Sequence, residues 1–333
     1  MFEKINLQLF ADNLNVNTTT QTGSGKDLSV ENKTFYDKTL IRLVGPNLIH
    51  AQFGQKRNIP KNGGKQIEFR KFSPLGKATT PLTEGVTPEG QSLDVSKVEA
   101  TVKQYGGYVA ITDTLDMTSI DPVVTETISL ISDQAAKTLD TIERDILCAG
   151  TNVQYADGSI EARSALTSNH KMTVDMLKRA VRTLKSQNAA RIDGYYVAIV
   201  HPSVAYDLMA DPDWADAQKH TAGNVNKLFK GEIGEIAGVK VVESTEAKVW
   251  KQGDLSVYGT LVIGKDAYGV TDIEGGGLET IVKPLGSGGT SDPLNQRSTV
   301  GWKAFHGAKI LYTERIIRAI TASSYTDDAT YTA

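Results

Sequence analysis

The stretch DPVVTETISLISDQAAKTLDTIERDILC, residues 121–148, decides the architecture of this chain. Asp121 is a residue type that caps helices, and Pro122 suits a first turn, where its missing N–H costs no hydrogen bond. Apolar residues then recur every three or four positions, which predicts one amphipathic helix of about seven turns. Its single apolar stripe consists of Val124, Ile128, Ile131, Ala135, Leu139, Ile142 and Ile146.

Charged residues complete the pattern of this helix. Asp133 with Lys137, and Asp140 with Arg144, place an acid four residues before a base, so we expect both pairs on its exposed side. Cys148, the only cysteine, ends the apolar stripe. One thiol forms neither an intrachain disulfide nor a cysteine-rich zinc site, and we interpret it as a small buried hydrophobe.

Residues 59–112, just before the helix, are predicted to form one long hairpin. The segments 66–72 and 95–105 have the composition of strands, and SPLGKATTPLTEGVTPEGQS at 73–92 separates them with three prolines and several turn-forming residues. Such a loop is longer than a compact domain needs, which indicates a function or a partner.

The two sides of this hairpin differ in charge. Basic residues dominate the outgoing side, with Glu68 as its only acid, and acidic residues dominate the returning side. These charges would either keep an exposed strand edge from aggregating or bring the basic side onto an acidic patch of an adjacent copy. The candidate assembly residues are Lys65, Arg70, Lys71, Lys77, Glu84 and Glu89.

The remaining chain predicts a mixed α and β subdomain between flexible ends. Residues 13–34 are polar and form an expected flexible arm, docked by a short helical pattern at 35–53. We expect a helix at 173–187 and strands at 195–200, 239–243 and 260–263. A glycine-rich joint at 286–293 precedes a long half-buried strand from Val300 to Tyr312, a further strand within 314–321 and a loose polar tail from Ala322.

Charge and motifs argue against most other function classes. The net charge of −3, from 36 basic and 39 acidic residues, provides no basic face for tight nucleic-acid binding. No apolar run approaches the roughly eighteen residues of a membrane helix, and MFEKINLQLFADN lacks the continuous apolar centre of a signal peptide. No glycine-rich stretch ends in the Lys-Ser/Thr of a phosphate-binding loop, and no cofactor is expected.

The histidines leave one enzymatic alternative. His50, His170, His201, His220 and His306 are too widely spaced in sequence for a helical metal site. His306 lies in an apolar strand pattern typical of a satisfied core histidine. His201 precedes a proline at a strand end, where a catalytic group could lie, so a hydrolase using a distant serine and acid stays open, although no serine elbow accompanies it.

Several motifs together resemble one known family. They are INLQLFAD at 5–12, RKFSPLGKATTPLTEGVTPEG at 70–90, QYGGYVAITD at 104–113, AAKTLDTIERDIL within the helix, IVHPSVAYDL at 199–208 and SDPLNQRSTVGWKAFHGAKIL at 291–311. The order of parts resembles the major capsid protein of tailed bacteriophages, with the α+β Hong Kong 97 fold. Within this family the chain is similar to the subfamily typified by the coat protein of coliphage N-four.

The resemblance implies a non-enzymatic shell subunit. Its expected parts are an N-terminal arm (1–58), an extended hairpin loop (59–112), a peripheral domain with the spine helix (113–171), an axial domain (172–295), closing peripheral strands (296–321) and a C-terminal tail (322–333). Copies would form the hexamers and pentamers of an icosahedral head around packaged double-stranded DNA, which they would touch only weakly. The head would assemble in the host bacterial cytoplasm with a portal, without any membrane contact.

Two family features are left as expectations. About 60 residues precede the loop, too few for a long scaffolding segment, which favours a separate scaffolding protein. Lys61, Lys65 or Lys77 with Asn295 would offer partners for a covalent cross-link, but any surface loop has such residues. An encapsulin-like shell or another virion component also remains compatible with this fold.

Overall fold

The computed structural model describes residues 48–73, 75–120, 123–156, 158–220, 232–289 and 292–325. The predicted arm and most of the helical pattern at 35–53 therefore lie outside the described residues. Two compact units share the chain. The first comprises Met1–Gly45, Gly106–Asp133 and Leu278–Lys303, and the second comprises Pro46–Tyr105, Gln134–Gly277 and Ala304–Ala333.

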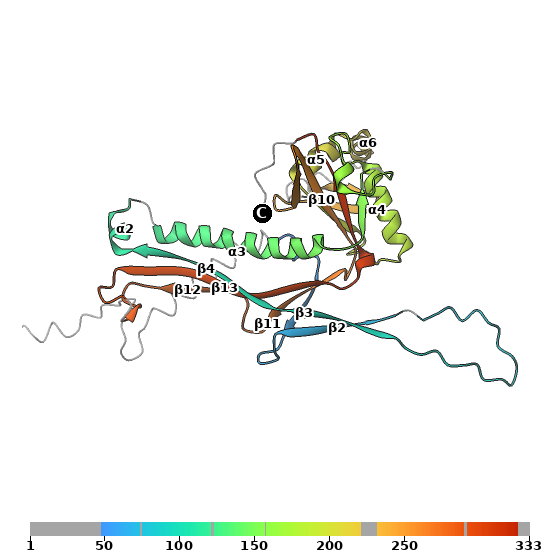
Figure 1. The fold of residues 1–333 in the computed structure, drawn as a ribbon, viewed down its shortest axis with the longest axis horizontal. Helices are drawn as coiled ribbons and strands as arrows, with labels where there is room; N and C mark the ends of the chain where they lie inside the picture. The colour runs from blue at the N-terminus through green and yellow to red at the C-terminus, as the bar shows by residue number, and fades with distance from the viewer. Residues whose placement is uncertain are drawn as a thin grey trace, which may run out of the picture. The chain divides into compact units, whose positions relative to one another are not determined.

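The predicted spine helix is confirmed as α3, Val123–Cys148 (Figure 1). Asp121 and Pro122, its expected first residues, lie outside the described part of the chain. Much of the apolar stripe is buried, as at Ile131 and Ala135. The prediction that Asp140 and Arg144 lie on the exposed side is wrong, because they are only 1% and 8% exposed. The helix buries pairs of adjacent residues on each turn, a wider face than one stripe.

The hairpin predicted at 59–112 is present, with one interruption. β2 (Gln66–Phe72) pairs antiparallel with β3 (Val95–Thr101) from Gln66↔Thr101 to Phe72↔Val95. The single strand expected at 95–105 instead breaks at Val102, and β4 (Lys103–Thr112) follows. The break occurs because the two parts pair with different strands. β3 pairs with β2, whereas β4 pairs with β13. α2 (Asp113–Thr118), capped by Thr112, comes directly after β4.

The second unit contains a seven-stranded sheet in the order β5-β14-β10-β6-β8-β7, with β9 paired to β10. Apolar side chains of its strands and of α4 bury each other in the largest core cluster. The helix predicted at 173–187 and the strands at 195–200 and 239–243 are confirmed, whereas the strand at 260–263 begins earlier, at Leu255. The elements are β5 (Val153–Tyr155), α4 (Val174–Ser186), β6 (Tyr196–Val200), α5 (Pro202–Met209), α6 (Pro212–His220), β7 (Glu232–Ile236), β8 (Val239–Glu243), β9 (Lys248–Gln252), β10 (Leu255–Ile263) and β14 (Ile316–Thr321).

A second sheet is built around the long strand β13 (Arg297–Ile310), which runs through both units. In the first unit it pairs with β12 (Glu279–Lys283). In the second unit it pairs with β11 (Tyr268–Ile273), which also carries the parallel strand β1 (Gln55–Ile59). The predicted alternation is confirmed for the apolar face, which is buried, and Gly301 and Gly307 on the other face are buried as well. Short 3-10 helices at Arg163–Ala165 and Thr313–Arg315 complete the described elements.

The C-terminal tail is anchored where it leaves β14. Ser323 donates from its hydroxyl to the carbonyl of Ser203, and the backbone N–H of Ser324 donates to Asp207 of α5 at 2.9 Å. The predicted loose tail is therefore wrong for residues 322–324, because Ala322 and Ser323 are buried and Ser323 and Ser324 hydrogen-bond to α5. Residues 326–333 lie outside the described part.

Among the described residues, no helix has the length and apolar character required to cross a bilayer.

Candidate assembly surface

The connection between β2 and β3 is an open loop that continues beyond the ends of both strands (Figure 1). Its base is closed by the backbone N–H of Ser73, which donates to the carbonyl of Asp94 at 3.0 Å. Near its tip, the N–H of Val86 donates to the carbonyl of Thr83 at 3.1 Å. Gly85 has a φ of +78° in this turn, a backbone conformation that favours glycine. The tip is therefore a defined turn.

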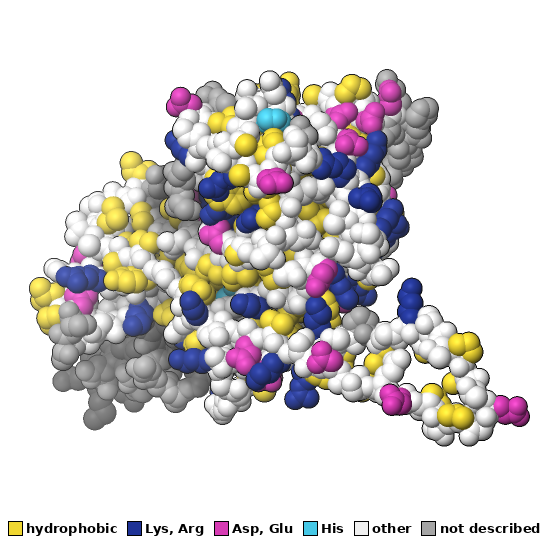
Figure 2. Space-filling model, turned by 45° about the vertical axis from the view of Figure 1, so that its right-hand side comes forward, with side chains coloured by type: hydrophobic (Ala, Val, Ile, Leu, Met, Phe, Trp, Pro, Cys, Tyr) yellow, Lys and Arg dark blue, Asp and Glu magenta, His cyan; other side chains and the backbone are white. Residues whose placement is uncertain are grey.

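Apolar side chains along this loop face water. Leu82, Val86 and Leu93 are 77%, 63% and 69% exposed, and Figure 2 shows hydrophobic and acidic side chains side by side on the open loop. Glu84 and Glu89 are exposed and have no ion-pair partner within the described part of the chain. Exposed apolar side chains gathered on one segment mark an interaction site.

The six predicted assembly residues divide into two groups. Lys65, Lys77, Glu84 and Glu89 lie separately on the surface, whereas Arg70 and Lys71 line one pocket. Lys71 is half-buried, with its ammonium 3.5 Å from a carboxylate oxygen of Glu314 and 4.4 Å from the centre of the Tyr312 ring.

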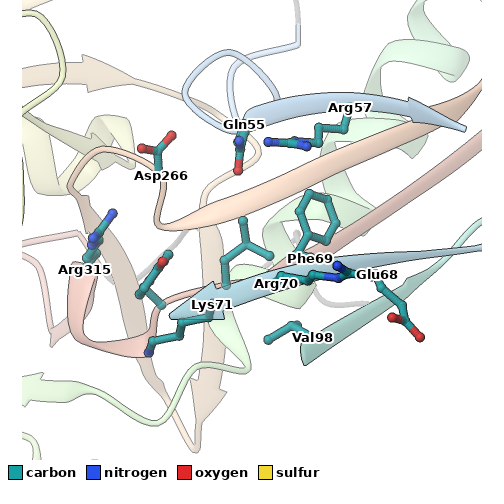
Figure 3. Close-up of a pocket in the computed structure, with 11 residues that line it drawn as sticks. Gln55, Arg57, Glu68, Phe69, Arg70, Lys71, Val98, Asp266 and Arg315 are labelled. Atoms are coloured by element: carbon teal, nitrogen blue, oxygen red, sulfur yellow. The ribbon is translucent and has the colours of Figure 1, made fainter. Parts of the chain in front are cut away.

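This pocket lies in the second unit and has a volume of about 700 Å³ (Figure 3). Arg57 on β1 and Arg315 after β13 join Arg70 and Lys71 around it. The sequence indicated that the hairpin is basic, but no pattern linked it to Arg315, which is far along the chain. Only the folded chain brings these cations together.

Buried contacts between acids and histidines hold the inner face of α3 in the second unit. His50 donates its backbone N–H to Asp140 at 2.8 Å, and its Nδ1 lies 2.6 Å from the second carboxylate oxygen. One turn later, Glu143 lies 2.7 Å from His306 Nε2, while His306 Nδ1 lies 2.9 Å from Asp272. His306 is thus the satisfied core histidine that the sequence predicted.

Burial and charge act in opposite directions on this cluster. Burial alone would lower the pKa of His306, but hydrogen bonds and charge attraction from Asp272 and Glu143 raise it to about 9. Burial also raises the pKa of Glu143, against the lowering effect of His306. His306 is therefore protonated at neutral pH and connects β13 to α3 as a cation.

His201 and Cys148 have structural roles. His201 is the N-cap of α5, and its Nδ1 accepts the N–H of Ser203 at 3.3 Å. Burial raises the pKa of the Cys148 thiol to about 11, which suits a buried hydrophobe rather than a nucleophile. Across the described ranges, no group of three or more histidine, cysteine and acidic side chains is arranged to hold a metal ion.

Comparisons with solved structures show similarity to phage capsids. The capsid of Ralstonia phage GP4 matches with a TM-score of 0.65 and 15% identity over 82% of this chain and 88% of that chain. The cyanophage Pam1 capsid matches with 0.67 and 14%, covering 85% and 92%. The cyanophage P-SCSP1u capsid matches with 0.61 and 16%, covering 83% and 89%. At these identities the similarity establishes the fold alone.

Sequence comparison establishes the family. No curated protein sequence matches the chain. The family model described as phage capsid protein, however, matches residues 95–319, well over half of the chain. That range begins at β3 and ends within β14, so it includes α3 and most strands of the two large sheets. Its members are structural components of the virion and not enzymes, which removes the hydrolase alternative at His201. The mixed α and β fold, the exposed loop and this match agree: the chain belongs to the phage capsid protein family.

Proposed function

We propose that this chain is a major capsid protein of the Hong Kong 97 type, which self-assembles into hexamers and pentamers. These would tile an icosahedral head around packaged double-stranded DNA. The observation that carries the proposal is the loop between β2 and β3, whose apolar and acidic side chains face water on a capsid fold. Burying them against other copies would remove that apolar surface from water, and many such contacts repeated by symmetry would stabilise a shell.

The parts of the chain would have distinct roles. Residues 59–112 would reach a neighbouring subunit, with Lys65, Arg70, Lys71, Lys77, Glu84 and Glu89 as contact residues. Residues 172–295, with most of the seven-stranded sheet, would form the axial domain at the capsomer centre. Residues 113–171 with α3, and 296–321 with β13 and β14, would form the peripheral domain. Residues 1–58 and 322–333 would be the terminal arm and tail.

The N-four-like subfamily assignment rests on the motifs of the sequence. We further propose a separate scaffolding protein and a portal as partners, with head assembly in the bacterial cytoplasm. The near balance of 36 basic and 39 acidic residues supports weak, non-specific contact with the packaged DNA.

Expression of the full chain, followed by size-exclusion chromatography and negative-stain electron microscopy, tests the assembly function. We expect capsomer rings, tubes or closed polyhedral shells, since the loop surface needs partner copies. A chain that stays monomeric and is also absent from the shell of particles isolated from phage would overturn the proposal. Nuclease-protected DNA in particles isolated from phage would identify a head, whereas an enclosed enzyme would identify an encapsulin-like compartment.

A further inference from the structure

The pocket of the second unit collects positive charge from three separate segments. Arg57 comes from β1, Arg70 from β2 and Arg315 from the turn after β13 (Figure 3). Glu68 and Asp266 are the acids of the lining, and the Glu68 carboxylate is already paired with Lys97 at 3.1 Å. The pocket therefore presents an excess of cations to whatever enters it.

Some of these cations are held in place before any ligand arrives. The Arg315 guanidinium lies 3.9 Å from the centre of the Tyr312 ring and donates to the carbonyl of Lys265 at 3.2 Å. Lys71 also lies over the Tyr312 ring, which therefore contacts two cations. Arg57, Arg70 and Arg315 have no ion-pair partner among the described residues. A rim of guanidinium groups without carboxylate partners, one of them held by a ring and a carbonyl, is preorganised for a carboxylate.

The pocket also has apolar side chains. Phe69 and Leu311 are each 8% exposed and pack in one small cluster with Val98. All three line the pocket. A ligand that combines one carboxylate with aliphatic side chains would match the cations and the apolar floor together.

The turn at the loop tip has this combination. Glu84 is exposed and unpaired among the described residues, and it lies between Leu82 and Val86, which are 77% and 63% exposed. The hydrogen bond from Val86 to Thr83 holds the backbone, so little ordering would be needed on binding. A subunit cannot readily fill its own pocket, because the loop continues outward beyond β2 (Figure 1).

We propose that the turn 82–86 of a second copy docks in this pocket, with the Glu84 carboxylate paired to Arg70 and attracted by the further positive charge of Arg57 and Arg315. Leu82 and Val86 of that copy contact Val98 and the remaining exposed edges of Phe69 and Leu311. This inference rests on the proposed assembly function and identifies the two surfaces that meet. Each copy carries both the turn and the pocket, so the contact is heterologous and continues from copy to copy around a ring.

A cysteine pair tests the contact directly. In the full chain carrying Arg70→Cys and Glu84→Cys, oxidation of assembled particles should produce a ladder of disulfide-linked multimers on a non-reducing gel. The native Cys148 is buried and leaves the background low. The matched control pairs Glu84→Cys with Lys56→Cys, an exposed position on β1 outside the pocket, and should produce no ladder.

The outcomes separate the two proposals. Particles that form without a ladder overturn the docking and leave the assembly function intact. Phage shells built from a different chain would overturn the assembly function, and the docking falls with it.

A charge exchange provides an independent readout. Arg70→Glu and Glu84→Arg should each cause a loss of assembly at physiological salt, because each places like charges together. The double variant should recover assembly, since the exchanged charges attract again. Glu161→Arg, exposed and outside both surfaces, serves as the control and should assemble normally. Failure of the double variant to recover, with normal circular dichroism, would contradict the pairing.

Discussion

Individual residues show how much of this fold depends on buried charge. Asp140 and Glu143, one turn apart on α3, are 1% and 0% exposed, and each contacts a histidine from a distant segment. A helix pattern alone assigns such acids to the water-facing side. Here they fix the position of the second half of α3 against the segment before β1 and against β13.

Replacing His306 with glutamine should lower the free energy of unfolding by about 3 kcal/mol, because Glu143 would remain buried without its cation. Glutamine is similar in size to histidine, so the loss of stability measures the removal of the positive charge more than a change in side-chain volume. Urea titration followed by circular dichroism measures it, and the exposed Lys61→Gln is the control. A loss below about 1 kcal/mol would mean that the ion pair contributes little.

The same histidine predicts a pH dependence. Its pKa in the folded chain, about 9, is above the ordinary 6.5, so its stabilising contribution is complete below about pH 6.5 and declines as the pH rises through 9. The stability difference between the parent chain and His306→Gln should therefore shrink between pH 7 and 10. Urea midpoints of both proteins across this range measure the effect. A constant difference would show that His306 is neutral throughout.

At the scale of elements, the pairing of β4 with β13 depends on close backbone approach. A Cβ added to Gly106 would lie 2.6 Å from the carbonyl oxygen of Trp302, closer than real Cβ atoms come to any atom. Backbone cannot move aside as a flexible side chain does, so only glycine fits where β4 lies beside this part of β13. A sequence pattern identifies the strands but does not identify this contact.

Gly106→Ala should accordingly lower stability by about 1–3 kcal/mol, as overpacking does elsewhere. Gly90→Ala, in the loop, is the matched control, because a Cβ there would meet nothing within 4 Å and its φ is not positive. Thermal unfolding of both variants measures the difference. Equal midpoints would show that β4 shifts to accommodate the methyl group at no cost.

For the whole molecule, charge on the hairpin matters for association more than for folding. Arg70 is exposed, and Lys71 has only a partly exposed contact with Glu314, so their charges contribute little to the stability of one subunit. Between copies the same charges would act over many repeated contacts.

The charge reversal Arg70→Glu with Lys71→Glu should therefore hinder assembly and leave the thermal midpoint of the subunit nearly unchanged. Light scattering follows assembly, and circular dichroism follows folding. High salt should weaken assembly of the parent chain in the same direction, because it screens exposed charges. Normal assembly of the double variant would exclude the hairpin charges from the contact.

Local periodicity by itself determined the long helix, α4, the hairpin strands and most strands of the second unit, because backbone hydrogen bonding and burial of one face act over neighbouring residues. The tertiary structure alone decided the break at Val102, the anchoring of Ser323 and Ser324, and the burial of Asp140 and Arg144. It also brought Arg315 to the basic pocket. Each of these depends on a contact with a segment far along the chain, and a local pattern contains no information about which distant segment becomes the neighbour.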